Sequence, residues 1–201
     1  MARTPQKPRR RLTVAVRRAE ILVAAATEFG ARPYSEVAVA DVAERAGTSE
    51  ALIYHYFNDK AGLYTELIQQ EAAELLWRQQ AEIDRLGQYA ATRDRVHAAL
   101  KMYLDVVTER PHPVIAPIAG NDPPAAAELR CRIRADYVNR LRDMLAPGQG
   151  FRHMFALWGF FGFLDAALLQ WAAEGCPVNQ RESLVAAALG ALEGALGDWG
   201  G

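Results

Sequence analysis

The sequence lacks most of the features that mark an enzyme or an exported protein. Only two cysteines occur among the 201 residues, Cys131 and Cys176, and neither lies at a metal-ligand spacing, which favours a reducing, cytoplasmic location over a disulfide framework. The four histidines form no metal-ligating pattern, and no P-loop or nucleophile elbow is present. The N-terminus has no continuous apolar signal segment. We therefore expect no metal, no cofactor and no catalysis.

No segment alternates apolar and polar residues over the length of a strand, and no internal repeat is present. Apolar residues recur at helical spacing instead, between breaks rich in proline and glycine. The sequence therefore predicts an all-α fold with about nine helices. These are expected at residues 13–31, 39–46, 50–57, 60–86, 89–109, 114–119, 125–145, 151–174 and 179–198.

One segment, from Met154 to Ala173, is almost wholly apolar and about as long as a membrane span. Asp165 lies near its middle, where a carboxylate costs about 2.5–3.5 kcal/mol on insertion scales. A helix buried inside a soluble bundle or dimer fits this pattern better. We expect no association with a membrane.

The formal net charge of −1 is unevenly distributed along the chain. Residues 1–18 contain seven basic residues and no acid, whereas residues 61–201 carry 13 lysines and arginines against 17 acids. This asymmetry is typical of a protein whose N-terminal region binds a polyanion, although a solvated tail gives the same pattern. We expect residues 1–12 to form a flexible basic arm.

Two short helices with a tight turn between them predict a helix-turn-helix within residues 13–60. Gly47 suits the left-handed position that ends the first helix, and Thr48 and Ser49 offer hydroxyls that can cap the second. In that second helix, Ile53 and Phe57 form a buried stripe together with Tyr56. The remaining face can enter a major groove and consists of Glu50, Ala51, Leu52, Tyr54 and His55.

The Tyr54 hydroxyl and the Lys60 ammonium are placed to hold DNA phosphates, which sets the register without reading sequence. The alternative is that any alanine-rich pair of helices shows the same spacing without binding DNA.

The run from Val39 to Lys60 resembles the helix-turn-helix signature of the tetracycline-repressor (TetR) family, and residues 21–29 resemble that family's first helix. The Ala46-Gly47 pair, the Tyr-His-Tyr-Phe run and the final lysine stand at the family's spacing. The likeness covers about residues 17–67. It implies that the contacts with double-stranded operator DNA fall on Thr48, Ser49, Glu50, Ala51, Leu52, Tyr54, His55 and Lys60.

The same likeness implies a regulator that senses a small-molecule effector, with repression as the expected sign because most relatives repress. The basic residues Arg9, Arg10, Arg11 and Arg17 could then lie along phosphates or enter a neighbouring minor groove.

Three positions depart from the family's pattern. Val37 and Ala38 stand where a threonine or serine usually caps the second helix, and Pro33 replaces the glycine that usually precedes the aromatic residue Tyr34. Glu50 opens the recognition helix with an acid, which suits a helix N-terminus but repels phosphates. It could accept a hydrogen bond from a cytosine, and both interpretations of Glu50 stay open. A ligand-binding helical dimer that no longer binds DNA is the alternative function.

Residues 61–201 are predicted to sense a ligand and to form the dimer. The apolar faces of the helices at 89–109, 125–145 and 151–174 could line a largely apolar pocket, although plain core packing explains each residue as well. The candidate ligand-binding residues are His97, Tyr103, Tyr137, Trp158, Phe161 and Asp165. The helix at 60–86 would connect this pocket to the DNA.

Small residues recur on the last two helices, and glycine in a helix interior costs about 1 kcal/mol relative to alanine. Close helix approach in a four-helix bundle between two subunits would offset that cost. Packing inside one chain is the alternative. A homodimer through these helices predicts a pseudo-palindromic operator. The residues concerned are Ala156, Gly159, Gly162 and Ala166, and Ala187, Gly190, Gly194 and Gly197.

Overall fold

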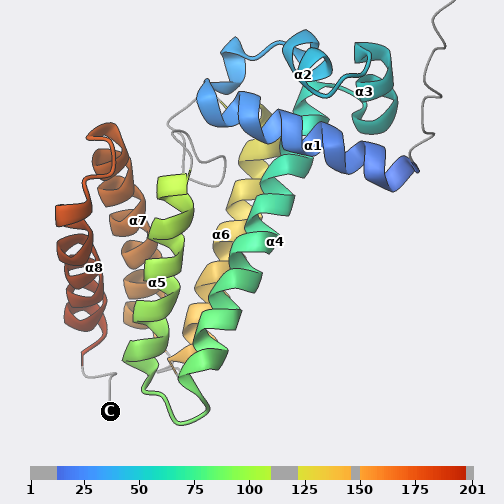
Figure 1. The fold of residues 1–201 in the computed structure, drawn as a ribbon. Coiled ribbons are helices and arrows are strands. Elements are labelled where there is room, and N and C mark those ends of the chain that lie inside the picture. The colour runs from blue at the N-terminus through green and yellow to red at the C-terminus, as the bar shows by residue number, and fades with distance from the viewer. Residues whose placement is uncertain (1–12, 110–121, 146–149, 198–201) are drawn as a thin grey trace, which may run out of the picture.

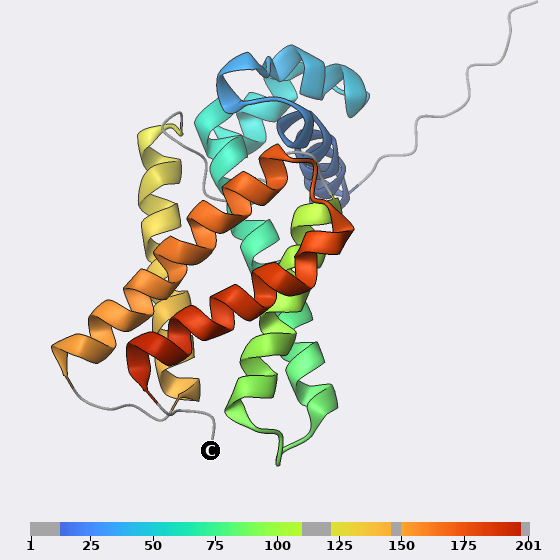
Figure 2. The ribbon, with the colours of Figure 1, turned by 90° about the vertical axis from the view of Figure 1, so that its left-hand side faces the viewer.

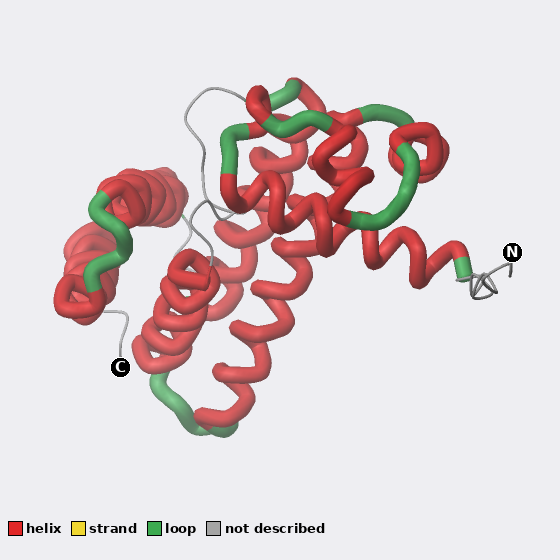
Figure 3. Tube along the Cα trace, turned by 45° about the horizontal axis from the view of Figure 1, so that its top comes forward, coloured by secondary structure: helices red, strands yellow, loops and turns green. Residues whose placement is uncertain are grey.

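The structure, a computed structural model, describes residues 13–109, 122–145 and 150–197, and every regular element in these ranges is helical (Figure 3). The prediction of an all-α fold is confirmed. The short helix expected at 114–119 lies outside the described residues. The elements are α1 (Val14–Ala31), the 3₁₀ turn η1 (Tyr34–Glu36), α2 (Val39–Arg45), α3 (Glu50–Phe57), α4 (Lys60–Leu86), α5 (Thr92–Glu109), α6 (Pro124–Met144), α7 (Phe151–Ala173), the 3₁₀ turn η2 (Val178–Gln180) and α8 (Arg181–Leu196).

The helices form two parts, which we call the head (α1–α3) and the body (α4–α8). The head sits at one end of α4, and α4 runs from there along the whole length of the body (Figure 1). Helices α5 and α6 both pack against α4, and α7 and α8 pack against each other across the body from it (Figure 2). The long α4 is therefore a rigid connection between head and body.

Two apolar cores hold these parts together, and α6 contributes to both. The core of the head contains Ile21, Ile53 and Leu67, and also Ala126 and Leu129 from the first half of α6. The core of the body contains residues from the second half of α6 and from α5, α7 and α8. Two helices, α4 and α6, therefore join head and body, where the sequence pattern had indicated only the first.

Ionic contacts tie α2 to α1 at the edge of the head. Glu28 is the one charged residue among those described that is buried, and its carboxylate accepts hydrogen bonds from Arg45 and Arg32, each at 2.5 Å. Arg32 also donates to Asp41 on α2 at 2.7 Å. The hydrogen bond from Arg45, together with that from Arg32, holds the pKa of Glu28 below its ordinary value.

The N-terminus of α2 shows how the head manages without the usual cap. Ala38 occupies the N-cap position and offers no side-chain hydrogen bond, in agreement with the departure seen in the sequence. Asp41 stands three residues further on and accepts a backbone hydrogen bond from Ala38, which is one half of a capping box. Its negative charge also suits the first turn of the helix.

Replacing Glu28 with glutamine is expected to lower the free energy of unfolding by about 1.5–3 kcal/mol at neutral pH, the usual value of hydrogen bonds to a charged group. The pKa of Glu28 is lower in the folded chain than its ordinary 4.5, so its contribution is complete above pH 4.5 and is lost as the pH falls through the folded pKa. Urea unfolding followed by circular dichroism at neutral and acidic pH measures both effects.

Glu44→Gln, an exposed acid on α2, is the matched control and should leave the free energy of unfolding unchanged. A difference between wild type and Glu28→Gln that persists unchanged in acid would contradict this account.

Candidate nucleic-acid interface and ligand cavity

Helix α3 presents one exposed face because its other face is anchored in the head. Ile53 is fully buried and Phe57 is 5% exposed, whereas Tyr54 is 43% exposed. The Ser49 hydroxyl caps the helix by accepting from the backbone N–H of Leu52 at 3.3 Å. Of the residues expected at DNA, those exposed are Ser49, Glu50, Ala51, Tyr54 and His55, and those half-buried are Thr48, Leu52 and Lys60.

The turn before α3 has the geometry that its sequence predicts. Gly47 has a φ of +60°, in the left-handed region that favours glycine. The backbone N–H of Thr48 returns to the carbonyl of Ala43 at 2.9 Å, which closes the turn. The turn and the cap together fix the angle at which α3 leaves α2.

The junction between α3 and α4 depends on a glycine that sequence reasoning missed. The Asp59 carboxylate caps α4 by accepting from the backbone N–H of Gly62 at 2.7 Å. A Cβ on Gly62 would lie 2.1 Å from the carbonyl oxygen of Phe57, the last residue of α3. The only signal in the sequence was a glycine in the first turn of a long helix, where it lowers helix propensity.

Lys60 rests on an aromatic cluster and does not extend freely into solvent. Its ammonium lies 4.3 Å from the ring centroid of Tyr34, and burial lowers its pKa. Tyr34 in turn packs against Phe29 and Tyr64, with the ring centroids of Tyr34 and Tyr64 4.9 Å apart. The charge at the start of α4 is therefore positioned by the core of the head.

The basic residues of the front end have different surroundings. Arg18 donates to the backbone carbonyl of Tyr56 at 2.7 Å, forms an ion pair with Glu66 and lies over the ring of Phe57, so it joins α1, α3 and α4. Arg17 forms an ion pair with Glu20 at 2.9 Å on α1. The predicted arm residues Arg9, Arg10 and Arg11 lie outside the described residues.

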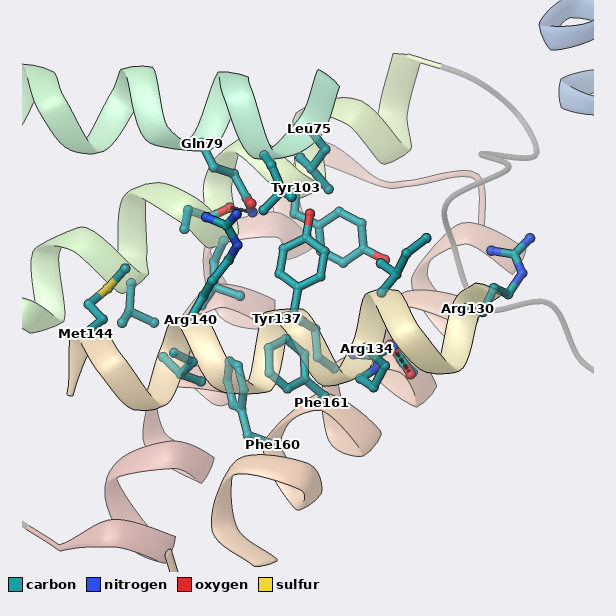
Figure 4. Close-up of a pocket in the computed structure, with 18 of the residues that line it drawn as sticks. Leu75, Gln79, Tyr103, Arg130, Arg134, Tyr137, Arg140, Met144, Phe160 and Phe161 are labelled. Atoms are coloured by element: carbon teal, nitrogen blue, oxygen red, sulfur yellow. Dashed lines mark hydrogen bonds and ion pairs between the residues drawn. The ribbon is translucent and has the colours of Figure 1, made fainter. Parts of the chain in front are cut away.

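A cavity of about 400 Å³ lies in the body between α4, α5, α6 and α7 (Figure 4). Most of its wall is apolar. Of the candidate ligand residues, five line it: Tyr103, Tyr137, Trp158, Phe161 and Asp165. The sixth, His97, is half-buried on α5 and is not among the lining residues, because the neighbouring Val96 and Leu100 occupy the inward stripe.

Sequence reasoning missed the arginines of the cavity wall, Arg130, Arg134 and Arg140 on α6. The spacing could have shown two of them, since Arg130 lies four residues before Arg134 and seven before Tyr137, which puts all three on one helical face. Basic residues on an amphipathic helix are ordinarily assigned to solvent. Gln79 of α4 lies close to Arg140 (Figure 4), and Gln80 also lines the cavity.

One end of the cavity contains an ion pair and two tyrosines. Arg134 donates to one carboxylate oxygen of Asp165, and its guanidinium lies 4.8 Å from the ring centroid of Phe161. Burial raises the pKa values of Asp165, Tyr103 and Tyr137. The second Asp165 oxygen and the Tyr137 hydroxyl are buried and have no hydrogen-bond partner within the described part of the chain.

A second polar network joins the cavity wall to the head. Arg130 donates to Asp122 at 2.5 Å and to the Tyr64 hydroxyl at 3.1 Å, and that hydroxyl lies 3.2 Å from the other Asp122 oxygen. Burial raises the pKa of Tyr64 to about 12, so its hydroxyl stays protonated. Arg130 contacts Tyr64, Tyr64 packs against Tyr34, and the Lys60 ammonium lies over the Tyr34 ring. Continuous contacts therefore run from the cavity to the start of α4.

The outer face of α7 and α8 is apolar and lacks bulky side chains at regular positions. A Cβ on any of Gly159, Gly162, Gly190 and Gly194 would meet no described atom within 4 Å, so nothing in the described part of the chain requires glycine there. Phe155 of α7 is 67% exposed beside them and does not line the cavity. By length and composition alone, α7 is the one described helix that could cross a membrane, and 39% of that apolar window is buried.

These features define a class of protein: a helix-turn-helix head on a helical body that encloses a cavity. Residues 21–67 match the family described as bacterial regulatory proteins, tetR family. The match covers most of the head and the start of α4, and the body lies outside it.

A curated relative, the HTH-type transcriptional activator FasR of Mycolicibacterium smegmatis, is 29% identical over 91 residues, which are 45% of this chain and 40% of the relative. The match therefore spans less than half of that protein.

Two solved structures share the fold over nearly the whole chain. The fatty acid degradation regulator FadR from Bacillus halodurans has a TM-score of 0.74 at 18% identity, over 96% of this chain and 99% of that one. FadR from Bacillus subtilis in complex with stearoyl-CoA has a TM-score of 0.68 at 18% identity, over 89% and 97% of the two chains.

Replacing Gly62 with alanine is expected to displace α3 from α4, because the new methyl group would meet the Phe57 carbonyl. Helix content measured by circular dichroism should change little, whereas binding to a selected DNA site in a gel shift should weaken at least about tenfold, or about 1.4 kcal/mol. Gly150→Ala, just before α7, is the matched control, because its backbone is extended and a Cβ there would meet no described atom within 4 Å. Unaltered DNA affinity in Gly62→Ala would show that the junction tolerates the shift.

Proposed function

We propose that this chain is a DNA-binding transcriptional regulator that acts as a homodimer and whose affinity for operator DNA is set by a small ligand in the cavity of the body. The observation that carries the proposal is α3, whose face with Tyr54 and His55 is exposed while Ile53 and Phe57 anchor it. That face belongs to the segment that matches the TetR family. An anchored helix with a free face is what a major groove accepts.

In this proposal, residues 13–60 bind DNA and residues 61–201 sense the ligand and form the dimer. This boundary divides the two functions, but it does not divide the apolar cores, since Leu63, Leu67 and Ile68 of α4 pack inside the head. The contacts to bases and phosphates fall on the residues of the turn, of α3 and at the start of α4. Arg9, Arg10, Arg11 and Arg17 add contacts to the backbone that carry no sequence information.

The dimer forms through α7 and α8. Their outer faces combine exposed apolar side chains, such as Phe155 and Phe163, with glycines whose missing side chains leave room for a second pair of helices. Two copies related by a two-fold axis would cover these faces and form a four-helix bundle. The same axis would present two copies of α3 to a pseudo-palindromic operator.

The ligand is an amphiphile with an apolar chain and an anionic head group. The cavity wall supplies the apolar surface, and Arg140, exposed where Gln79 and Gln80 also line the cavity, supplies a cation for the head group. The similar FadR from Bacillus subtilis is in complex with stearoyl-CoA, and a long-chain acyl thioester has both parts. Long-chain acyl-CoA is therefore the first class of compound to test.

Ligand binding reaches the DNA through α4 and α6, since both helices line the cavity and both enter the core of the head. A ligand that prefers one arrangement of these helices shifts the population toward it by its differential affinity. Release of a repressor is the sign expected from the sequence. The activator among the relatives leaves activation as the other outcome of a reporter assay.

Selection from random DNA should return a pseudo-palindromic site, and a gel shift on that site tests the function directly. Lys60→Ala is expected to weaken binding and to reduce the slope of log affinity against log salt by about one unit, because one phosphate contact is lost. Tyr54→Phe should also weaken binding. Both variants should remain dimers in sedimentation experiments.

Lys101→Ala is the matched control, because Lys101 pairs with Glu182 in the body at 3.2 Å. An unaltered salt slope in Lys60→Ala would remove Lys60 from the interface. Failure of the wild type to select any DNA would favour a ligand-binding dimer without operator binding.

Gly162→Leu tests the dimer. A Cβ at this exposed position would meet no atom of the described chain within 4 Å, so the helix content should not fall, but a leucine would collide with a partner's helices. We expect the dimer dissociation constant from analytical ultracentrifugation to rise at least about 30-fold, since overpacking costs about 1–3 kcal/mol and the effect counts twice across a two-fold axis. Ala127→Leu, at an exposed position of α6, provides the comparison, and a dimer as tight as the wild type in Gly162→Leu would exclude this face.

A further inference from the structure

The first residue of α3, Glu50, carries a charge that nothing on its own helix balances. Its side chain is exposed, and its carboxylate takes part in no ion pair or side-chain hydrogen bond within the described residues. From Ala46 to Asn58, which cover the turn and α3, Glu50 is the only acid, and the segment contains no lysine or arginine. A carboxylate in this position would meet the phosphates of a bound duplex without a cation beside it.

We propose that Glu50 selects a cytosine in each half of the operator, because its carboxylate accepts a hydrogen bond from the N4 amino group of that base. DNA with another base at this position meets the repulsion without the hydrogen bond. The inference rests on the proposed function, since it concerns the DNA contacts of the same helix. It assigns one of the two roles that the sequence leaves open for Glu50.

The first turn of α3 sets where the carboxylate lies. The Ser49 hydroxyl accepts from the backbone N–H of Leu52 at 3.3 Å and so fixes the helix start directly before Glu50. Glu50 lies one turn before Tyr54, and its Cα–Cβ bond tilts toward the N-terminus of the helix. The N-terminal residues of a recognition helix are those that contact base edges.

The anchoring of α3 keeps Glu50 at the edge of the exposed face. Ile53 is fully buried and Phe57 nearly so, which means that α3 cannot rotate about its axis without exposing both. Ala51 is exposed next to Glu50, and its side chain ends at Cβ. It does not hold the helix away from the floor of a groove, so the longer side chain of Glu50 can reach a base.

The chemistry of the four bases favours cytosine. A carboxylate accepts hydrogen bonds and donates none. In the major groove guanine presents two acceptors and thymine presents one, so both oppose a carboxylate. Adenine offers an amino donor with the N7 acceptor beside it, whereas cytosine offers the N4 amino group and no acceptor on the same base.

The charge also excludes DNA that lacks this base. On any other base the carboxylate would lose water without gaining a donor, and it would remain close to phosphates. Specificity is a difference between two affinities, and a repulsive contact with the wrong partner increases that difference. Glu50 therefore lowers the affinity for DNA in general and restores it at one base pair of each half-site.

A purely structural role is the competing explanation, because a negative charge in the first turn stabilises a helix. That role would change the stability of the head and would be the same for every DNA sequence. The ratio of the affinities for two DNA sites is independent of the fraction of folded protein. This ratio therefore responds to a base contact and not to folding.

Selection from random DNA with the wild-type chain should return a cytosine at a position repeated in both half-sites. A gel shift then compares the selected site with one in which this cytosine is replaced by thymine in one half-site, which exchanges the N4 donor for the O4 acceptor. The wild type should lose at least about fivefold in affinity, the usual effect of one mismatched base pair. A selected site without such a cytosine would overturn the proposal.

Glu50→Gln keeps the length of the side chain and removes its charge. Its amide both donates and accepts, so the loss on replacing the cytosine should fall to within about twofold. The affinity for a duplex of random sequence should rise at least about twofold, since each subunit loses one repulsive charge. Glu50→Asp keeps the charge but shortens the reach by one methylene group, so it should weaken the preference for cytosine without raising the affinity for random DNA.

Glu44→Gln is the matched control, because it removes the same charge from an exposed position of α2, and it should retain the preference for cytosine. Discrimination against thymine that is as strong in Glu50→Gln as in the wild type would overturn the proposal, and so would an equal loss of preference in Glu44→Gln. DNA binding whose base preference does not depend on Glu50 would reject this inference alone. A wild type that binds no DNA would reject the proposed function together with it.

Discussion

The burial of Ile53 and Phe57 is the constraint on which the rest of the head depends. A helix of eight residues is not stable in water by itself, so α3 persists only because these two side chains are held by α1, α2 and α4. Because one face of α3 is anchored in this way, the residues on its opposite face need not pack against the rest of the chain. Tyr54 and His55 can therefore be selected for what they contact outside the molecule.

In the body, α6 contributes side chains to two apolar cores. Its first half packs in the head through Ala126 and Leu129, and its second half packs in the body through Val138 and Leu141. The residues of α6 that line the cavity run from Arg130, next to Leu129, to Met144 at the end of the helix. Any change in the cavity that moves α6 must be accommodated in the core of the head, because close-packed cores transmit displacement and do not absorb it.

Most helix limits could be predicted from the sequence because their signals are local. Gly47, Ser49 and Asp59 each mark a turn or a cap through their own backbone and side-chain chemistry, and the structure places them in those roles. The exposed face of α3 followed from the 3.6-residue period in the same way. Such features need no knowledge of distant parts of the chain.

Features that depend on distant residues could not be predicted. Arg130 and Tyr64 are 66 residues apart in sequence, and nothing in either neighbourhood indicates that they meet. The contact of Lys60 with the Tyr34 ring and the clash expected at Gly62 depend on how α3 and α4 cross. The pattern on α5 placed His97 beside the inward stripe, but only the packed neighbours decide whether such a residue reaches the cavity.

The described residues that line the cavity come from four helices of one chain, and this has a consequence for dose response. A two-fold assembly would contain two complete sites, so its stoichiometry is one effector per subunit. Helix α7 offers Phe161 and Asp165 to one site on its inner side and a face rich in glycine on its outer side. In a dimer through α7 and α8, occupancy of one subunit's cavity would affect the other subunit's cavity through α7, which belongs to both the cavity wall and the outer face. The steepness of the titration curve would then report how rigidly α7 is held.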